Sequence, residues 1–198
     1  MQKGFTTGSR MISIQESERV AVLDSCVLVP MALCDTLLRL AEEPAMYRPV
    51  WSEPIMQELS KALRTKLHRS AAQIEYRLKQ MNRAFPEAMI KAPAALIKAA
   101  ECIPDKNDRH ILAAAIAGHA NVIVTQNTKH FPTKCLDEYG VTTRTADRFL
   151  IDLYHLNQRI VLDKLDDQAA AIAKDRAFII ASLKQAAAKF SELLQERS

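Results

Sequence analysis

The sequence predicts an α/β fold built on a short parallel sheet with crossover helices. Short apolar segments rich in β-branched residues alternate with segments of helical periodicity, which is the pattern of a parallel sheet joined by helices. Of the 198 residues, 48% are hydrophobic, enough for a sizeable buried core. The 4 glycines are too few for the many tight turns of a sandwich or barrel.

The first half of the chain gives the clearest elements. Val20–Leu23 is predicted to be a strand buried on both faces of the sheet, and 31–40 has the apolar spacing of a helix. Val50 and Trp51 belong to a second predicted strand. Ser52, two residues before Pro54, marks the start of the next helix, which runs on from there.

The second half continues the alternation. Further helices are predicted over about 71–84, 87–100 and 108–117, a short helix over 135–139, and strands over 121–124 and 141–143. After Gly140 there is no glycine and no proline, and we expect two or three helices in 146–198. The predicted division is therefore a flexible leader (1–18), an α/β domain (19–145) and a helical C-terminal extension (146–198).

Composition and charge narrow the class of protein. No apolar run approaches about 18 residues, so no membrane span is expected. The first 18 residues lack the apolar core of a secretory signal, and the four cysteines form no CxxC pair; we expect a cytoplasmic protein with reduced, buried thiols. The net charge is +4, and residues 61–91 carry eight lysines and arginines against two glutamates. This stretch is either a solvated helix face or a surface for phosphates.

Three acids are candidate ligands or catalysts, and each has an ordinary structural interpretation. Asp24 follows the first strand, where sites form in parallel sheets, but a turn residue is equally expected there. Glu58 flanks the apolar face of its helix, although most such glutamates are simple surface residues. Asp108 opens a helix, where aspartate is a preferred cap.

Other polar residues fall at the same predicted edge of the sheet. Asp105 precedes Asp108 by three positions and is a second capping acid or another ligand. Thr125 and Asn127 follow a strand, and His130 is a lone histidine of the kind that is more often hydrogen-bonded or exposed than a ligand. Clustered carboxylates repel one another, and a hard divalent cation such as Mg²⁺ or Mn²⁺ resolves that conflict.

With these residues in place, the sequence resembles PIN-domain proteins, close to the VapC-type toxins of bacterial toxin–antitoxin pairs. The resemblance covers about residues 19–145 and rests on the order of "VLDSCVL", "YRPVWSEPIMQEL", "PDKNDRHILAAAI" and "VIVTQNTKHFP". It implies a three-layer α/β/α fold and metal-dependent endoribonuclease chemistry, with Asp24, Glu58 and Asp108 as the family's acids. It further implies that Asn127 is the fourth polar position of the site.

The chain departs from the family pattern at three positions. Asn127 stands where many relatives have aspartate, Cys26 where many have asparagine, and His130 where many have another aspartate. An amide coordinates a metal without adding charge, so the number of metals, one or two, stays open. Asp105 is a candidate to compensate.

The resemblance leads to a functional hypothesis. Mg²⁺ or Mn²⁺ held by the acids would activate water for attack on an RNA phosphate, leaving 5′-phosphate and 3′-hydroxyl ends. Arg64 and Lys66 are candidates to follow the RNA backbone, and Thr125 to contact substrate. Arg39 and Arg109 either bind phosphate or pair with carboxylates, and we favour ion pairing. The expected partners are RNA, a separately encoded antitoxin and a second copy of the chain.

Alternatives from other classes remain. A haloacid-dehalogenase-type phosphatase would also use an acid after the first strand, but it needs a second aspartate at the position of Cys26. A receiver domain matches poorly. A PIN-fold protein with an incomplete metal site that only binds RNA or a partner is made credible by Asn127. No helix-turn-helix is evident, so DNA binding would belong to the antitoxin.

Overall fold

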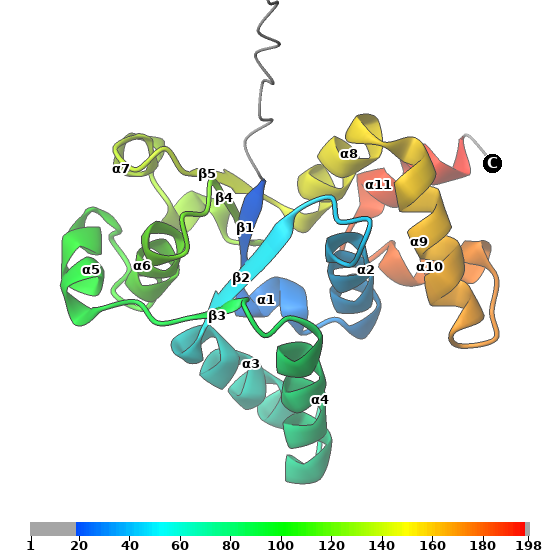
Figure 1. Ribbon diagram of the computed structural model, residues 1–198, viewed down its shortest axis with the longest axis horizontal. Coiled ribbons are helices and arrows are strands. Elements are labelled where there is room, and N and C mark those ends of the chain that lie inside the picture. Colours follow the sequence, from blue (N-terminus) through cyan, green and yellow to red (C-terminus); the bar gives the residue numbers. More distant parts are fainter. Residues whose placement is uncertain (1–18, 197–198) are drawn as a thin grey trace, which may run out of the picture.

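The fold is a five-stranded parallel sheet between two layers of helices (Figure 1). The computed structural model describes residues 19–196, so the predicted leader (1–18) lies outside the described residues. The strands are β1 (Val20–Leu23), β2 (Arg48–Ser52), β3 (Met89–Ile90), β4 (Val122–Val124) and β5 (Thr142–Arg144). They lie in the order β3-β2-β1-β4-β5, and every neighbouring pair is parallel. The predicted α/β/α class is confirmed.

Helices cover both faces of this sheet. Those between the strands are α1 (Ser25–Leu28), α2 (Met31–Ala41), α3 (Glu53–Thr65), α4 (Ala71–Ala84), α5 (Ala94–Ala99), α6 (Arg109–Ala117) and α7 (Thr133–Asp137). Those of the extension are α8 (Ala146–Leu156), α9 (Gln158–Ala170), α10 (Arg176–Leu183) and α11 (Ala188–Gln195). In Figure 1, α5 to α7 lie on one side of the sheet, and α2 with α8 to α11 on the other. Among the described residues, the helices are all too short or too polar to cross a membrane.

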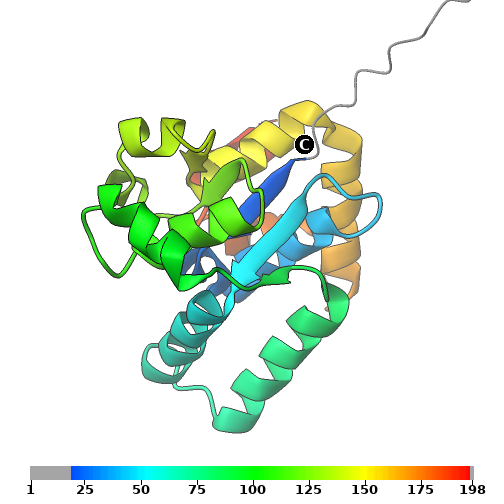
Figure 2. The same cartoon turned by 60° about the vertical axis from the view of Figure 1, so that its left-hand side comes forward.

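The central strand, β1, ends beside its neighbours and so places the site-forming residues at the C-terminal ends of the strands. β1 is buried along its whole length and pairs with β2 on one side and β4 on the other, as its apolar sequence predicted. The backbone N–H of Asp24 continues this pairing by donating to Val124 O at 3.1 Å. Asp24 and Thr125 therefore follow β1 and β4 at their carboxyl ends, and Ser52 is the last residue of the adjacent β2. The helices α3 and α4 project beyond this end of the sheet (Figure 2).

The predicted helix over 87–100 is wrong in its first half. Met89 and Ile90 form the edge strand β3 beside Trp51 and Ser52, and only α5 and a short 3₁₀ turn at Ala100–Cys102 are helical. Pro93 explains the boundary, because proline has no N–H to donate inside a helix and biases the preceding residue toward an extended conformation.

The extension contains four helices rather than the expected two or three. Side-chain caps begin two of them, where the sequence has neither glycine nor proline: Asn157 Oδ1 accepts from Ile160 N at 3.1 Å at the start of α9, and Asp175 Oδ1 from Phe178 N at 2.8 Å at the start of α10. The helices pack on the core: α9 runs beside α2, and Phe190 is fully buried. The division into domains at 145 stays a prediction.

Candidate active site

Asp24 is a buried carboxylate held by side chains from the end of β4 and from the start of α1. It is 4% exposed. Its Oδ2 accepts hydrogen bonds from the Thr125 hydroxyl at 2.6 Å and the Cys26 thiol at 3.0 Å, and the Ser25 hydroxyl lies 3.2 Å from Oδ1. A buried carboxylate requires such donors, so its orientation toward the edge of the sheet is fixed.

Thr125 donates a hydrogen bond to Asp24 from within the core. It is fully buried, its hydroxyl donates to Asp24, and the same oxygen accepts from Asn127 N at 3.1 Å. This hydrogen bond holds the Asp24 carboxylate in place, and the contact of Thr125 with substrate stays a prediction.

Ser25 connects Asp24 to the second acid. Its hydroxyl lies 3.0 Å from Glu58 Oε2 as well as 3.2 Å from Asp24 Oδ1, so it can donate to either carboxylate. Glu58 comes from α3, which enters the site because β2 ends beside β1. Nothing in the sequence distinguishes Ser25 as a site residue, since serine after a strand is common in turns.

The electrostatic environment of Glu58 shows that the third acid, Asp108, is nearby. Burial raises the pKa of the Glu58 carboxyl, and the charges of Asp24 and Asp108 raise it further, while His110 and the Ser25 hydroxyl act to lower it. Three acids from three separate elements therefore repel one another at this edge, which is the arrangement that a divalent cation stabilises.

Asp108 precedes α6 as its N-cap residue, yet its side chain forms no capping hydrogen bond. Its Oδ2 instead lies 2.7 Å from His130 Nδ1. Asp105, Asp108 and His130 each offer a ligand atom, and these atoms lie within 4.8 Å of one another, a spacing that can hold a metal ion. His130 is thus hydrogen-bonded, as the sequence favoured, but its partner is a candidate ligand. Asn127 is exposed and begins the same short turn.

His110 was not selected from the sequence and lies beside Glu58. Its Nε2 is 3.5 Å from Glu58 Oε1, and the side chain is 12% exposed. It sits in the first turn of α6 directly before the buried Ile111 and Leu112, so a polar residue at the edge of an apolar helix face was the available signal.

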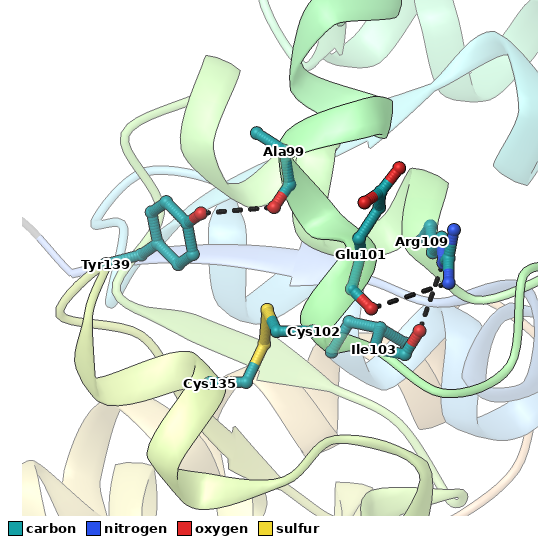
Figure 3. Close-up of a disulfide and its surroundings, with 7 residues drawn as sticks. All are labelled: Ala99, Glu101, Cys102, Ile103, Arg109, Cys135 and Tyr139. Atoms are coloured by element: carbon teal, nitrogen blue, oxygen red, sulfur yellow. Dashed lines mark hydrogen bonds between the residues drawn. A yellow bond between two sulfur atoms is a disulfide. The ribbon is translucent and has the colours of Figure 1, made fainter.

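A disulfide joins the two segments that carry Asp108 and His130, which corrects the expectation of reduced thiols. Cys102 bonds to Cys135 across a sequence separation of 33, whereas Cys26 and Cys34 are free (Figure 3). The Tyr139 hydroxyl donates to Ala99 O at 3.3 Å beside it. Pairs so distant in sequence become neighbours only through the fold.

Arg109 forms hydrogen bonds to the backbone next to this disulfide. Its Nε donates to Ile103 O at 3.0 Å and its Nη2 lies 3.4 Å from Glu101 O (Figure 3). The expected ion pair for Arg109 is therefore wrong: backbone carbonyls occupy its guanidinium. Arg39 does form the expected ion pair, with Asp35 at 3.1 Å.

The other predicted cations lie on the surface of α3. Arg64 and Lys66 are exposed near its C-terminal end, about 9–12 Å along the axis from Glu58 at 1.5 Å per residue. Lys61 is one turn from Glu58, and it shares a cavity wall with Glu58 and Lys106. Lys61 and Lys106 are thus the nearer positive charges; Lys61 begins the basic stretch noted in the sequence, whereas Lys106 lies outside it.

Comparison with known proteins identifies the family. The sequence model of the PIN domain matches residues 20–129, more than half of the chain. The chain belongs to the PIN domain family. This PIN domain contains Asp24, Glu58, Asp108 and Asn127, and His130 follows the matched region directly.

One curated relative is similar over a shorter stretch. "Putative ribonuclease VapC50" of Mycobacterium tuberculosis strain H37Rv is 51% identical over 45 residues, which are 23% of this chain and 27% of that protein. The match thus spans about a quarter of the relative.

Proposed function

We propose that this PIN-domain protein is a metal-dependent endoribonuclease that hydrolyses RNA phosphodiester bonds. The observation that carries the proposal is the meeting of Asp24, Glu58 and Asp108, with Ser25 between the first two and the pKa of Glu58 raised in part by the others. Carboxylates that repel one another at the C-terminal ends of parallel strands become a favourable arrangement when a cation binds between them.

The donor set fits Mg²⁺ or Mn²⁺. Asp24, Glu58 and Asp108 would hold the ion, and Asn127 and Asp105 offer further oxygen ligands. When bound, such an ion polarises a phosphoryl oxygen and lowers the pKa of a water nucleophile. The imidazole of His130 beside Asp108 gives this site a nitrogen donor, which Mn²⁺ accepts more readily than Mg²⁺.

The chain's own residues prepare the site. Thr125 and Ser25 fix the carboxylates, so that little reorganisation is needed when substrate arrives. Lys61 and Lys106 flank Glu58 and would attract the RNA backbone without selecting its sequence. Arg39 and Arg109 are engaged within the protein, so we assign them to structure; Arg64 and Lys66 would contact RNA further from the cleavage point.

The biological role follows from the family resemblance. The ribonuclease named in the similar relative supports RNA as the substrate class. We extend the proposal to the toxin of a type II toxin–antitoxin pair acting in the cytoplasm, which inhibits translation or growth. It would be neutralised by a separately encoded antitoxin and would form a homodimer.

The test is RNA cleavage by the purified chain with Mg²⁺ or Mn²⁺ and then with EDTA. We expect cleavage only with metal, and a loss of at least 100-fold in Asp24→Asn and Asp108→Asn, on the order seen when groups that stabilise transition-state charge are removed. Asp163→Asn, at an exposed pair with Arg159 on α9, is the matched control and should cleave normally.

Cleavage that persists in EDTA, or in both site variants, rejects the metal-dependent mechanism. If the chain binds RNA but never cleaves it with either metal, Asn127 marks an incomplete site and the protein is an RNA- or partner-binding member of the family. Calorimetric titration with Mn²⁺ then separates the cases, since a working site binds metal only while Asp24 and Asp108 are intact.

A further inference from the structure

Two adjoining cavities extend from the candidate active site toward the β3 edge of the sheet. One, the Glu58 cavity, has a volume of about 370 Å³ and has Glu58, Lys61 and Lys106 on its walls. The other, the Ser52 cavity, has a volume of about 410 Å³ and lies among residues of β2, β3, α5 and α6. Pro54 and His110 line both, so the two cavities lie on either side of these side chains.

The Ser52 cavity combines apolar walls with one buried hydroxyl that has no partner among the described residues. Ser52 is 2% exposed, and its Oγ has no hydrogen-bond partner among the described residues, although it is the N-cap residue of α3. His110 lines the same cavity, and its Nε2, although it makes no hydrogen bond within residues 19–196, faces Glu58 Oε1 at 3.5 Å. Buried polar groups are almost always paired, so the unpaired Ser52 hydroxyl at this cavity points to a polar ligand.

The volume of the Ser52 cavity and the residues that line it indicate the class of ligand. Ile90 and Ile97 provide apolar surface, and the volume lies in the range of small-molecule pockets. Lys91 stands at the wall of this cavity, and Lys61 and Lys106 stand in the next one. A flat ring with polar edges, attached to a phosphate, satisfies the apolar, polar and positive parts together.

We propose that the Ser52 cavity binds an unstacked nucleobase of single-stranded RNA, adjacent to the phosphate that is cleaved. This inference rests on the proposed nuclease function. The base enters between Ile90 and Ile97, its polar edge meets the Ser52 hydroxyl, and its phosphate lies near Lys61 and Lys106. A base paired and stacked in a duplex cannot enter, so the cavity makes the enzyme select single strands and loops.

The experiment fills the cavity and removes the base in turn. Ala92 lines the Ser52 cavity, and Ala92→Trp would occupy it. Ala45→Trp is the matched control, because Ala45 lines a cavity of about 740 Å³ among residues at the amino ends of the strands. Both are placed in the Asp24→Asn background so that RNA is not consumed, and the affinity for a short labelled single strand is measured by fluorescence anisotropy.

We expect Ala92→Trp to weaken binding about 10-fold, on the order of the contribution of one bound base, and Ala45→Trp to leave the affinity unchanged. A series of strands, each with one abasic nucleotide, completes the test. One abasic position should weaken binding to the Ala45→Trp chain by the same factor, yet cost the Ala92→Trp chain nothing more.

A smaller change guards against misfolding. Ser52→Ala removes a hydroxyl that bonds to nothing described, so the melting temperature should hold while affinity falls several-fold. Two results overturn the proposal. One is equal RNA affinity of Ala92→Trp and Ala45→Trp when both have a native melting curve. The other is that abasic nucleotides weaken the binding of both variants equally. Metal-dependent cleavage by the unsubstituted chain is scored separately: cleavage without a cavity effect rejects only the base site, and a cavity effect without cleavage rejects only the nuclease.

Discussion

The disulfide between Cys102 and Cys135 provides a quantitative prediction. Opening it in Cys102→Ser frees a loop with a sequence separation of 33. The chain-entropy relation gives about 4 kcal/mol for a loop of that length, contributed by confining the unfolded state. Because domains are typically stable by about 5–15 kcal/mol, the variant should still fold, but melt roughly 10 °C lower.

The measurement is urea denaturation followed by circular dichroism, with and without a thiol-free phosphine reductant. The oxidised wild type should be the most stable sample, and reduction should lower it to the level of Cys102→Ser. Cys102 is the better position to substitute, because it is exposed, whereas Cys135 is 4% exposed and a serine there would add the cost of a buried hydroxyl. Cys102→Ser itself should not respond to reductant.

Cys26→Ser is the matched control, the same substitution at a free cysteine, and it should keep the response to reductant. The bond also joins the segments of Asp108 and His130, so we expect Mn²⁺ affinity to fall several-fold on reduction. Wild type and Cys102→Ser with identical denaturation midpoints under oxidising conditions would falsify the entropic argument.

Three further outcomes are expected from the contacts of the site and core. Burial and like charge raise the pKa of Glu58 in the native chain, so above pH 4.5 the native chain holds a proton that the unfolded chain has lost, and ionising Glu58 then lowers the stability of the fold. In EDTA, Glu58→Gln should therefore melt at a higher temperature than the wild type at neutral pH, but not below pH 4.5. Thr125→Val removes the shortest donor to Asp24 and should lower unfolding free energy by about 1–3 kcal/mol in urea titrations. Gly118→Ala should cost about 1–3 kcal/mol in the same assay, because its Cβ would lie 2.8 Å from Val50 Cγ1; an unchanged midpoint would show that Val50 moves freely.

The elements that sequence reasoning placed correctly carry their own signals. β1 is an uninterrupted apolar segment, and α4 begins at Ser70 with a capping box and ends where predicted. α6 ends at Gly118, as its sequence indicated. Each of these rests on residues within a few positions of the boundary, so no tertiary information was needed.

The elements that were missed depend on distant partners. β3 has two residues and exists because Trp51 N and its neighbours offer hydrogen bonds to the segment, for example to Ala88 O at 2.9 Å. The Cys102–Cys135 bond depends on α7 lying beside the turn before α6. His110 and Ser25 are ordinary in sequence, and only their distances to Glu58 give them meaning.

The helical extension is tied to the site as well as to the core. Gln126, between Thr125 and Asn127, donates from its side chain to Ala186 O at 3.2 Å, in the connection between α10 and α11. Those helices bury Leu183 and Phe190 in the same core that supports β1. The cost of keeping repelling carboxylates together is therefore offset by packing that reaches beyond the matched PIN region. Truncation near residue 146 would remove core contacts and a site support at once, so loss of activity in such a variant would not show that the extension binds RNA.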